Sequence, residues 1–103
     1  MDIIIESLHP ALKAWLLNSA LAPHLESYCT YFKLGRCAAT YSVACVAGLA
    51  HFARWMTQCG LAVEQLDAHK VEQFLNEHLP YCDCPKPVRR NRGALRAALG
   101  HLL

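Results

Sequence analysis

The chain carries its densest set of chemically active side chains near its C-terminal end. Five basic residues lie between positions 84 and 103, and that segment contains no Asp or Glu. They are Lys86, Arg89, Arg90, Arg92 and Arg96. The arginines at 89, 92 and 96 are three and four positions apart, so they share one face of a helix. Such a face is either a plain solvated surface or a surface that binds a polyanion. The lack of any compensating acid on the helix favours the phosphate backbone of DNA.

A second stretch of the chain is also free of carboxylates. Residues 27–63 contain Lys33, Arg36 and Arg54, and all eight acidic residues lie outside both this stretch and segment 84–103. The net charge is only +2, so the distribution of charge is more informative than its total. If the two stretches meet in the fold, they form one positive face.

One group of residues has the side chains of a zinc site. His78, Cys82 and Cys84 form an H-x3-C-x-C pattern, which supplies three zinc ligands at the end of a predicted helix. The C-x-C spacing is tighter than the usual C-x2-C, and the sequence indicates no fourth ligand. The alternative interpretation, thiols packed under a proline-rich turn, is favoured, so no metal or other cofactor is expected.

The motifs of the common enzyme classes do not occur in the sequence. It contains no P-loop, no G-x-G-x-x-G, no G-x-S-x-G and no H-E-x-x-H, and its six histidines are scattered. His51 lies beside an apolar stripe and is expected to pack rather than react. An enzyme whose active site lies wholly within this chain is therefore not expected.

Length and composition indicate one folded domain. The 103 residues are 54% hydrophobic and 17% charged, which excludes a disordered tail. No apolar run approaches the roughly 20 residues of a membrane span. The N-terminal segment MDIIIESLHP has an acid where a secretory signal has basic residues. A cytoplasmic protein with reduced cysteines is the expectation.

The spacing of apolar residues predicts helices throughout the chain. The expected helices cover about residues 7–18, 23–34, 41–59, 68–79 and 88 onward. Thr40 and Asp67 are expected as N-caps, Gly60 as the end of the long helix, and Gly35 at the C′ position of the helix before it. The apolar stripe of the long helix comprises Tyr41, Cys45, Leu49, Phe52, Met56 and Cys59, widened by Trp55.

Taken in order, these elements resemble a known family. A Thr-capped long helix ends in F-x2-W and Gly, the pattern L-D-x3-V-x2-F-L follows, and a last helix carries A-L and a terminal Leu. The matching residues are Gly35, Thr40, Tyr41, Phe52, Trp55, Gly60, Leu66, Asp67, Val71, Phe74, Leu75, Ala94, Leu95 and Leu102. Residues 20–103 thereby resemble the N-terminal core-binding domain of tyrosine recombinases, the phage-integrase and Xer-type enzymes. The loop with Cys82 and Cys84 is longer and richer in Cys and Pro than the family pattern, and the long helix has little charge beyond Arg54.

The resemblance implies a fold, a function and a parent protein. The fold would be all-α, a compact orthogonal bundle of four to five helices of the SAM-like type, with residues 1–19 as an N-terminal helical extension. The chain would form one half of a clamp around double-stranded DNA at a recombination site, and the catalytic domain would form the other half. Further recombinase protomers on the DNA would be additional partners. The catalytic domain with its tyrosine nucleophile would lie downstream in the parent, so the chain itself would not be an enzyme. The resemblance also implies a bacterial or phage-derived protein associated with the nucleoid.

The same resemblance implies the DNA contacts. The start of the long helix and the basic last helix would face the duplex, flanked by further cations. The expected contact residues are Lys33, Arg36, Thr40, Lys86, Arg89, Arg90, Arg92 and Arg96. The alternative function is a helical protein–protein interaction module, because so apolar a chain can expose a patch on which a partner docks.

Overall fold

Helices make up the regular structure of the described part of the protein. The structure is a computed structural model, which describes residues 6–36, 38–79 and 92–101, without the side chains of Ala39 and Arg92. The helical elements are α2 (Pro10–Leu17), η1 (Ala22–His24), α3 (Leu25–Leu34), α4 (Ala39–Cys59), η2 (Val63–Gln65), α5 (Ala68–Gln73), η3 (Phe74–His78) and α6 (Arg92–Gly100). No strand occurs in these ranges, so the predicted all-α bundle is confirmed.

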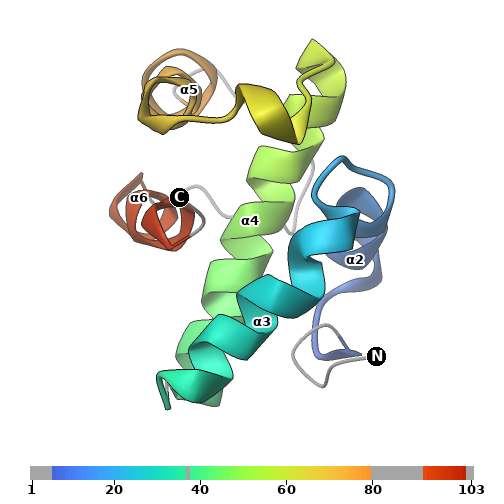
Figure 1. Cartoon of the computed structure of the whole chain (residues 1–103), viewed down its shortest axis with the longest axis vertical. Helices are drawn as coiled ribbons and strands as arrows, with labels where there is room; N and C mark the ends of the chain where they lie inside the picture. The colour runs from blue at the N-terminus through green and yellow to red at the C-terminus, as the bar shows by residue number, and fades with distance from the viewer. Residues whose placement is uncertain (1–5, 37, 80–91, 102–103) are drawn as a thin grey trace.

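The long helix α4 is the centre around which the other helices pack. Figure 1 shows α2 and α6 on opposite sides of α4, α3 across one end of it, and α5 near the other end. In that view α4 lies lengthwise while α5 and α6 are seen nearly end on, so α6 crosses α4 instead of running along it. The crossing is close because position 48 on α4 is glycine. A Cβ there would lie 3.1 Å from Leu95 Cδ2 and 3.6 Å from Ala98 Cβ, both on α6.

The core follows the apolar stripe that the sequence predicts, except at its two ends. Cys45, Leu49, Phe52 and Met56 are buried, and Trp55 joins them. Tyr41 and Cys59 were expected in this stripe, but Tyr41 is 43% exposed and Cys59 is also exposed. These two residues lie in the first and last turns of α4, where the neighbouring helices no longer cover the stripe.

The ends of α4 confirm one predicted signal and correct another. Gly60 closes the helix with φ 68°, and its N–H donates to the carbonyls of Met56 and Thr57, as expected of a left-handed C-terminal glycine. Thr40 is not the N-cap; Ala38 holds that position, with no side-chain hydrogen bond, and Thr40 lies inside the first turn. The helix therefore begins two residues earlier than predicted, at Ala39 instead of Tyr41.

The end of α3 differs from the prediction by one residue. Gly35 was expected at the C′ position, but it is the C-cap with φ −79°, and the next residue, Arg36, has the left-handed φ of 55°. The last turn is tightened by a bond from the Arg36 N–H to the Lys33 carbonyl at 3.1 Å, which carries the helical geometry through the glycine. Arg36 therefore adopts a conformation that costs a residue with a Cβ roughly 1–2 kcal/mol.

The helix expected over residues 68–79 changes type midway. Asp67 is its N-cap as predicted, and the carboxylate accepts from the Lys70 N–H at 2.9 Å. After Gln73 the chain widens into the π-helix η3, in which the Leu79 N–H bonds to the Phe74 carbonyl five residues back. This turn brings both Phe74 and Leu75 into the core, where neither is exposed.

The first two expected helices also differ from the sequence prediction. The first helix, α2, begins at Pro10. Its N-cap is His9, whose ring Nδ1 accepts from the Ala11 N–H at 3.1 Å. The second expected helix starts as the 3-10 turn η1 and becomes α3 at Leu25. The loop 80–87 and residues 88–91 of the expected last helix lie outside the described residues.

Candidate functional site

The structure describes half of the predicted DNA-contacting set. Lys33, Arg36, Thr40 and Arg96 are described with their side chains. For Arg92 only the backbone is described, as the first residue of α6. Lys86, Arg89 and Arg90 lie outside the described residues.

Lys33, Arg36 and Thr40 lie together where α3 ends and α4 begins; we call this set the basic corner. All three side chains are exposed. The first turn of α4 contains no acid, and its N-cap contributes no side-chain hydrogen bond. The first backbone N–H groups of a helix are positively polarised and lack partners within the helix. The corner thus combines two cationic side chains, a hydroxyl and the positive end of a 21-residue helix.

Arg96 is held by an acid from another helix. Its guanidinium makes two parallel contacts with the Glu72 carboxylate on α5, Nη1 to Oε1 and Nη2 to Oε2, the second at 3.2 Å. Both side chains are nearly half exposed, at 49% and 42%. The sequence indicates no compensating acid on α6 itself, and the compensating carboxylate comes from 24 residues earlier in the chain.

Arg54, the cation in the middle of α4, faces away from α6. Its guanidinium lies 4.9 Å from the centre of the Trp15 ring on α2, which is the geometry of a cation–π contact. Since α2 and α6 lie on opposite sides of α4, Arg54 adds no charge to the α6 side (Figure 1).

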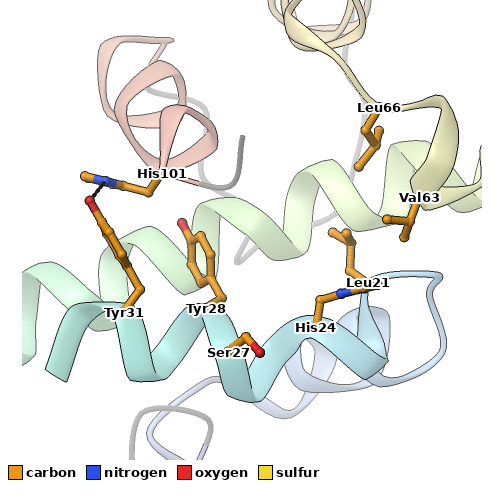
Figure 2. Close-up of a pocket in the computed structure, with 8 residues that line it drawn as sticks. All are labelled: Leu21, His24, Ser27, Tyr28, Tyr31, Val63, Leu66 and His101. Atoms are coloured by element: carbon orange, nitrogen blue, oxygen red, sulfur yellow. Dashed lines mark hydrogen bonds between the residues drawn. The ribbon is translucent and has the colours of Figure 1, made fainter. Parts of the chain in front are cut away.

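The two carboxylate-free stretches meet where α6 packs on α3 and α4. The buried Tyr28 hydroxyl on α3 donates to the Ala98 carbonyl on α6 at 2.7 Å. At the end of α6, His101 is hydrogen-bonded through Nδ1 to the Tyr31 hydroxyl at 3.1 Å and through Nε2 to the Tyr41 hydroxyl at 2.9 Å. Figure 2 shows the His101–Tyr31 side of this arrangement. The end of α6 is therefore fixed beside the basic corner.

Arg96 lies on a different side of α6 from the side that His101 extends toward the basic corner. Arg96 precedes His101 by five positions, which is about 140° around a helix and about 7.5 Å along it. His101 faces α3 and α4, whereas Arg96 faces α5. Although the two carboxylate-free stretches meet, the described cations of the predicted DNA-contacting set do not form the single positive face expected from the sequence. They form two separate groups, the basic corner and the Arg96–Glu72 pair.

The histidine of the zinc hypothesis is part of an aromatic cluster. His78 stacks on Phe74 with ring centres 5.3 Å apart, and the His51 ring lies 5.4 Å from His78. His51 is fully buried and packs edge-on against Phe74, as the sequence predicts. Cys82 and Cys84 lie outside the described residues, and no group of three or more metal-binding side chains is found within them.

A groove of about 350 Å³ lies on the side of α3 that faces η2 and the end of α6. The Tyr28 ring forms part of its floor, and burial raises the pKa of the Tyr28 hydroxyl, so this group remains a proton donor to Ala98. Tyr31 and His101 close one end of the groove (Figure 2). The sequence contains no motif that predicts this groove, because its walls come from segments far apart in the chain.

Comparison with known proteins found no matching family model, no matching curated protein and no matching solved structure. Among the described helices, none is long and apolar enough to cross a membrane.

Proposed function

We propose that this chain is a DNA-binding domain, of the core-binding kind that its sequence resembles in tyrosine recombinases. The observation that carries the proposal is the packing of α6 on α3 and α4, which joins the two carboxylate-free stretches. The Tyr28–Ala98 hydrogen bond and the two contacts of His101 hold that junction together. Strand-transfer chemistry would belong to a catalytic domain of the parent protein.

The backbone of Arg36 supports a functional role for its charge. A left-handed φ of 55° is free of strain for glycine, and Gly35 stands one position earlier without using this freedom. Strained positions held by a residue with a side chain occur preferentially at functional sites. A phosphate contact gives a reason for an arginine at this position.

The start of α4 supplies the matching backbone geometry. A phosphate oxygen placed before the first turn would meet the positive end of the helix dipole, with the Thr40 hydroxyl beside it. Lys33 and Arg36 would neutralise neighbouring phosphates of the same strand. Contacts of this kind position a domain on DNA, whereas base-edge contacts specify sequence.

The ion pair with Glu72 must open before Arg96 can contact a phosphate. A phosphate that approaches Arg96 competes with the Glu72 carboxylate for the same two N–H groups. Exposed ion pairs contribute only about 0–1 kcal/mol, so the exchange is energetically accessible. The basic corner is therefore the primary contact, and Arg96 joins it when the pair with Glu72 opens.

Titration of a duplex with the protein at several salt concentrations tests the proposal. Each phosphate neutralised contributes about −0.9 to the slope of log K against log salt, so five or six contacts give a slope near −5. Arg36→Glu is expected to weaken binding at least about fivefold and to flatten the slope by about one contact. Lys13→Glu on α2 makes the same charge change on the opposite side of α4 from α6 and serves as the control.

Two results would contradict the proposal. One is an absence of binding at low salt, and the other is an equal loss of affinity in the Arg36→Glu and Lys13→Glu proteins. The second would show that only net charge matters and that the basic corner has no special part.

A second function, docking of a protein partner, is favoured by one observation. Three of the four large hydrophobic side chains exposed in the described part lie at or beside the basic corner, namely Tyr31 at 51%, Leu34 at 80% and Tyr41 at 43%. Clustered exposed apolar groups are typical of interaction surfaces. Sedimentation of the protein without DNA separates the two functions: self-association that Leu34→Ser abolishes supports docking.

A further inference from the structure

The groove beside α3 has one apolar end and one polar end. Figure 2 shows Leu21, Val63 and Leu66 gathered at one end, while the hydrogen-bonded pair Tyr31–His101 closes the other. Leu21 is buried, and Val63 and Leu66 are only partly covered, so the apolar end is accessible. A molecule that lies along the groove would meet these two environments in turn.

Two polar side chains along the α3 wall have unused hydrogen-bonding capacity. His24 and Ser27 line the groove one helical turn apart, and within the described residues neither side chain has a hydrogen-bonding partner. The hydroxyls of Tyr28 and Tyr31 are already engaged, with Ala98 and His101. A ligand would therefore find its hydrogen-bonding partners at Ser27, between the two ends, and at His24, beside Leu21 (Figure 2).

The charge and size of the groove limit what it can hold. No Lys, Arg, Asp or Glu is among the described residues that line it. A charged ligand would therefore meet no carboxylate, ammonium or guanidinium group among the described residues of the lining. The volume of about 350 Å³ lies at the lower end of the range for small-molecule sites, about 300–1,000 Å³.

We propose that this groove binds a small uncharged amphipathic molecule. Its alkyl or aryl body lies against Leu21, Val63 and Leu66, and its hydroxyl or amide group bonds to Ser27 and His24. The groove shares no lining residue with the basic corner, although Tyr31 at its polar end lies beside that corner, and its occupation does not depend on DNA.

Para-propylphenol is a suitable probe, because it combines an apolar body with one hydroxyl group. Saturation-transfer NMR on the full chain is expected to show saturable binding, and the melting temperature is expected to rise with probe concentration by mass action. Ser27→Trp should abolish binding by filling the groove. Thr30→Trp, an equally large change at an exposed position of α3 that does not line this groove, should leave binding intact.

Two further measurements address the chemistry of the site. His24→Ala should weaken binding of para-propylphenol at least about threefold, since one hydrogen bond is lost. Para-propylbenzoate, which is anionic, should bind at least about tenfold more weakly than the phenol. Circular dichroism verifies that each variant is folded. The proposal is overturned if no saturation occurs, if the benzoate binds as tightly as the phenol, or if Ser27→Trp and Thr30→Trp behave alike.

Discussion

Tyr28 is the single side chain that most directly ties α3 to α6. Its hydroxyl is buried and donates to the Ala98 carbonyl at 2.7 Å. Tyr28→Phe removes the donor and leaves a buried carbonyl lacking this partner, so the free energy of unfolding should fall by about 1–2 kcal/mol. Tyr31→Phe, which removes an exposed hydroxyl, should cost less than half as much. Urea denaturation of both proteins measures the difference, and equal losses would contradict the role given to Tyr28.

The same hydroxyl predicts a loss of stability in alkali. Burial, with smaller contributions from Cys45 and Tyr41, raises the pKa of Tyr28 above its ordinary value of 10.0. Above about pH 10 the unfolded chain releases this proton while the folded chain retains it, so the unfolded state is favoured as pH rises. The stabilising effect is complete below about pH 10 and declines above it. Denaturation at several pH values should show a steeper alkaline decline for the natural protein than for Tyr28→Phe.

Substitution of Arg36 by asparagine should change stability and DNA binding in opposite ways. Asparagine tolerates the left-handed conformation better than arginine, so Arg36→Asn should raise the free energy of unfolding by up to about 1 kcal/mol. The same substitution removes a charge that is proposed to contact phosphate, so it should weaken DNA binding at least about threefold. Thermal denaturation and duplex titration test the two halves, and a variant that gains stability without losing affinity would remove Arg36 from the DNA surface.

At the scale of elements, the crossing of α4 and α6 depends on Gly48. Gly48→Leu places a side chain where a Cβ alone would already lie 3.1 Å from Leu95, and should destabilise the protein by about 1–3 kcal/mol. At Gly100 on α6 an added Cβ meets nothing within 4 Å, so Gly100→Leu should be neutral or stabilising by up to about 1 kcal/mol. Denaturant titration of both variants provides the comparison. Equal effects would mean that helix propensity, and not close packing, determines the role of Gly48.

The elements show which features of a fold are encoded locally. Apolar spacing predicts the helices and most of the core, because burial on one face sets the period of the sequence. The caps at Gly60 and Asp67 were also predictable, since each depends on its own backbone conformation or side chain. The π-turn of η3 was not, because the demand that both Phe74 and Leu75 enter the core arises only when the helices pack.

At the scale of the whole molecule, Glu72 pairs with Arg96 and, under the proposed function, would limit how much positive charge a polyanion meets. Glu72→Gln should change stability by less than about 1 kcal/mol, as expected for an exposed ion pair. It should strengthen DNA binding and steepen its salt dependence by about one phosphate contact, since Arg96 is released. Arg96→Gln should do the reverse, and the double variant should match Arg96→Gln. Titration of one duplex with all three proteins tests whether Arg96 contributes to DNA binding. Unchanged affinity in Glu72→Gln would exclude Arg96 from the proposed DNA-binding surface.

The candidate site was only partly predictable from sequence. Charge distribution predicts Lys33 and Arg36 as contact residues, because a run of residues without carboxylates is visible along the chain. The partners of His101 are 60 and 70 residues away, so no local pattern predicts that it joins α3, α4 and α6. The compensation of Arg96 likewise depends on α5 lying beside α6.

The wide turn of η3 has a consequence for how this chain tolerates changes of length. A π-turn accommodates one residue more than an α-turn, and here the Leu79 N–H reaches back five positions to Phe74. Deleting one of the exposed residues at 76 or 77 would convert the turn to ordinary α geometry and leave the flanking segments in line. Elsewhere a one-residue deletion rotates everything downstream by about 100°, as it would in α4. Length variation within this part of the fold is therefore most readily absorbed at η3.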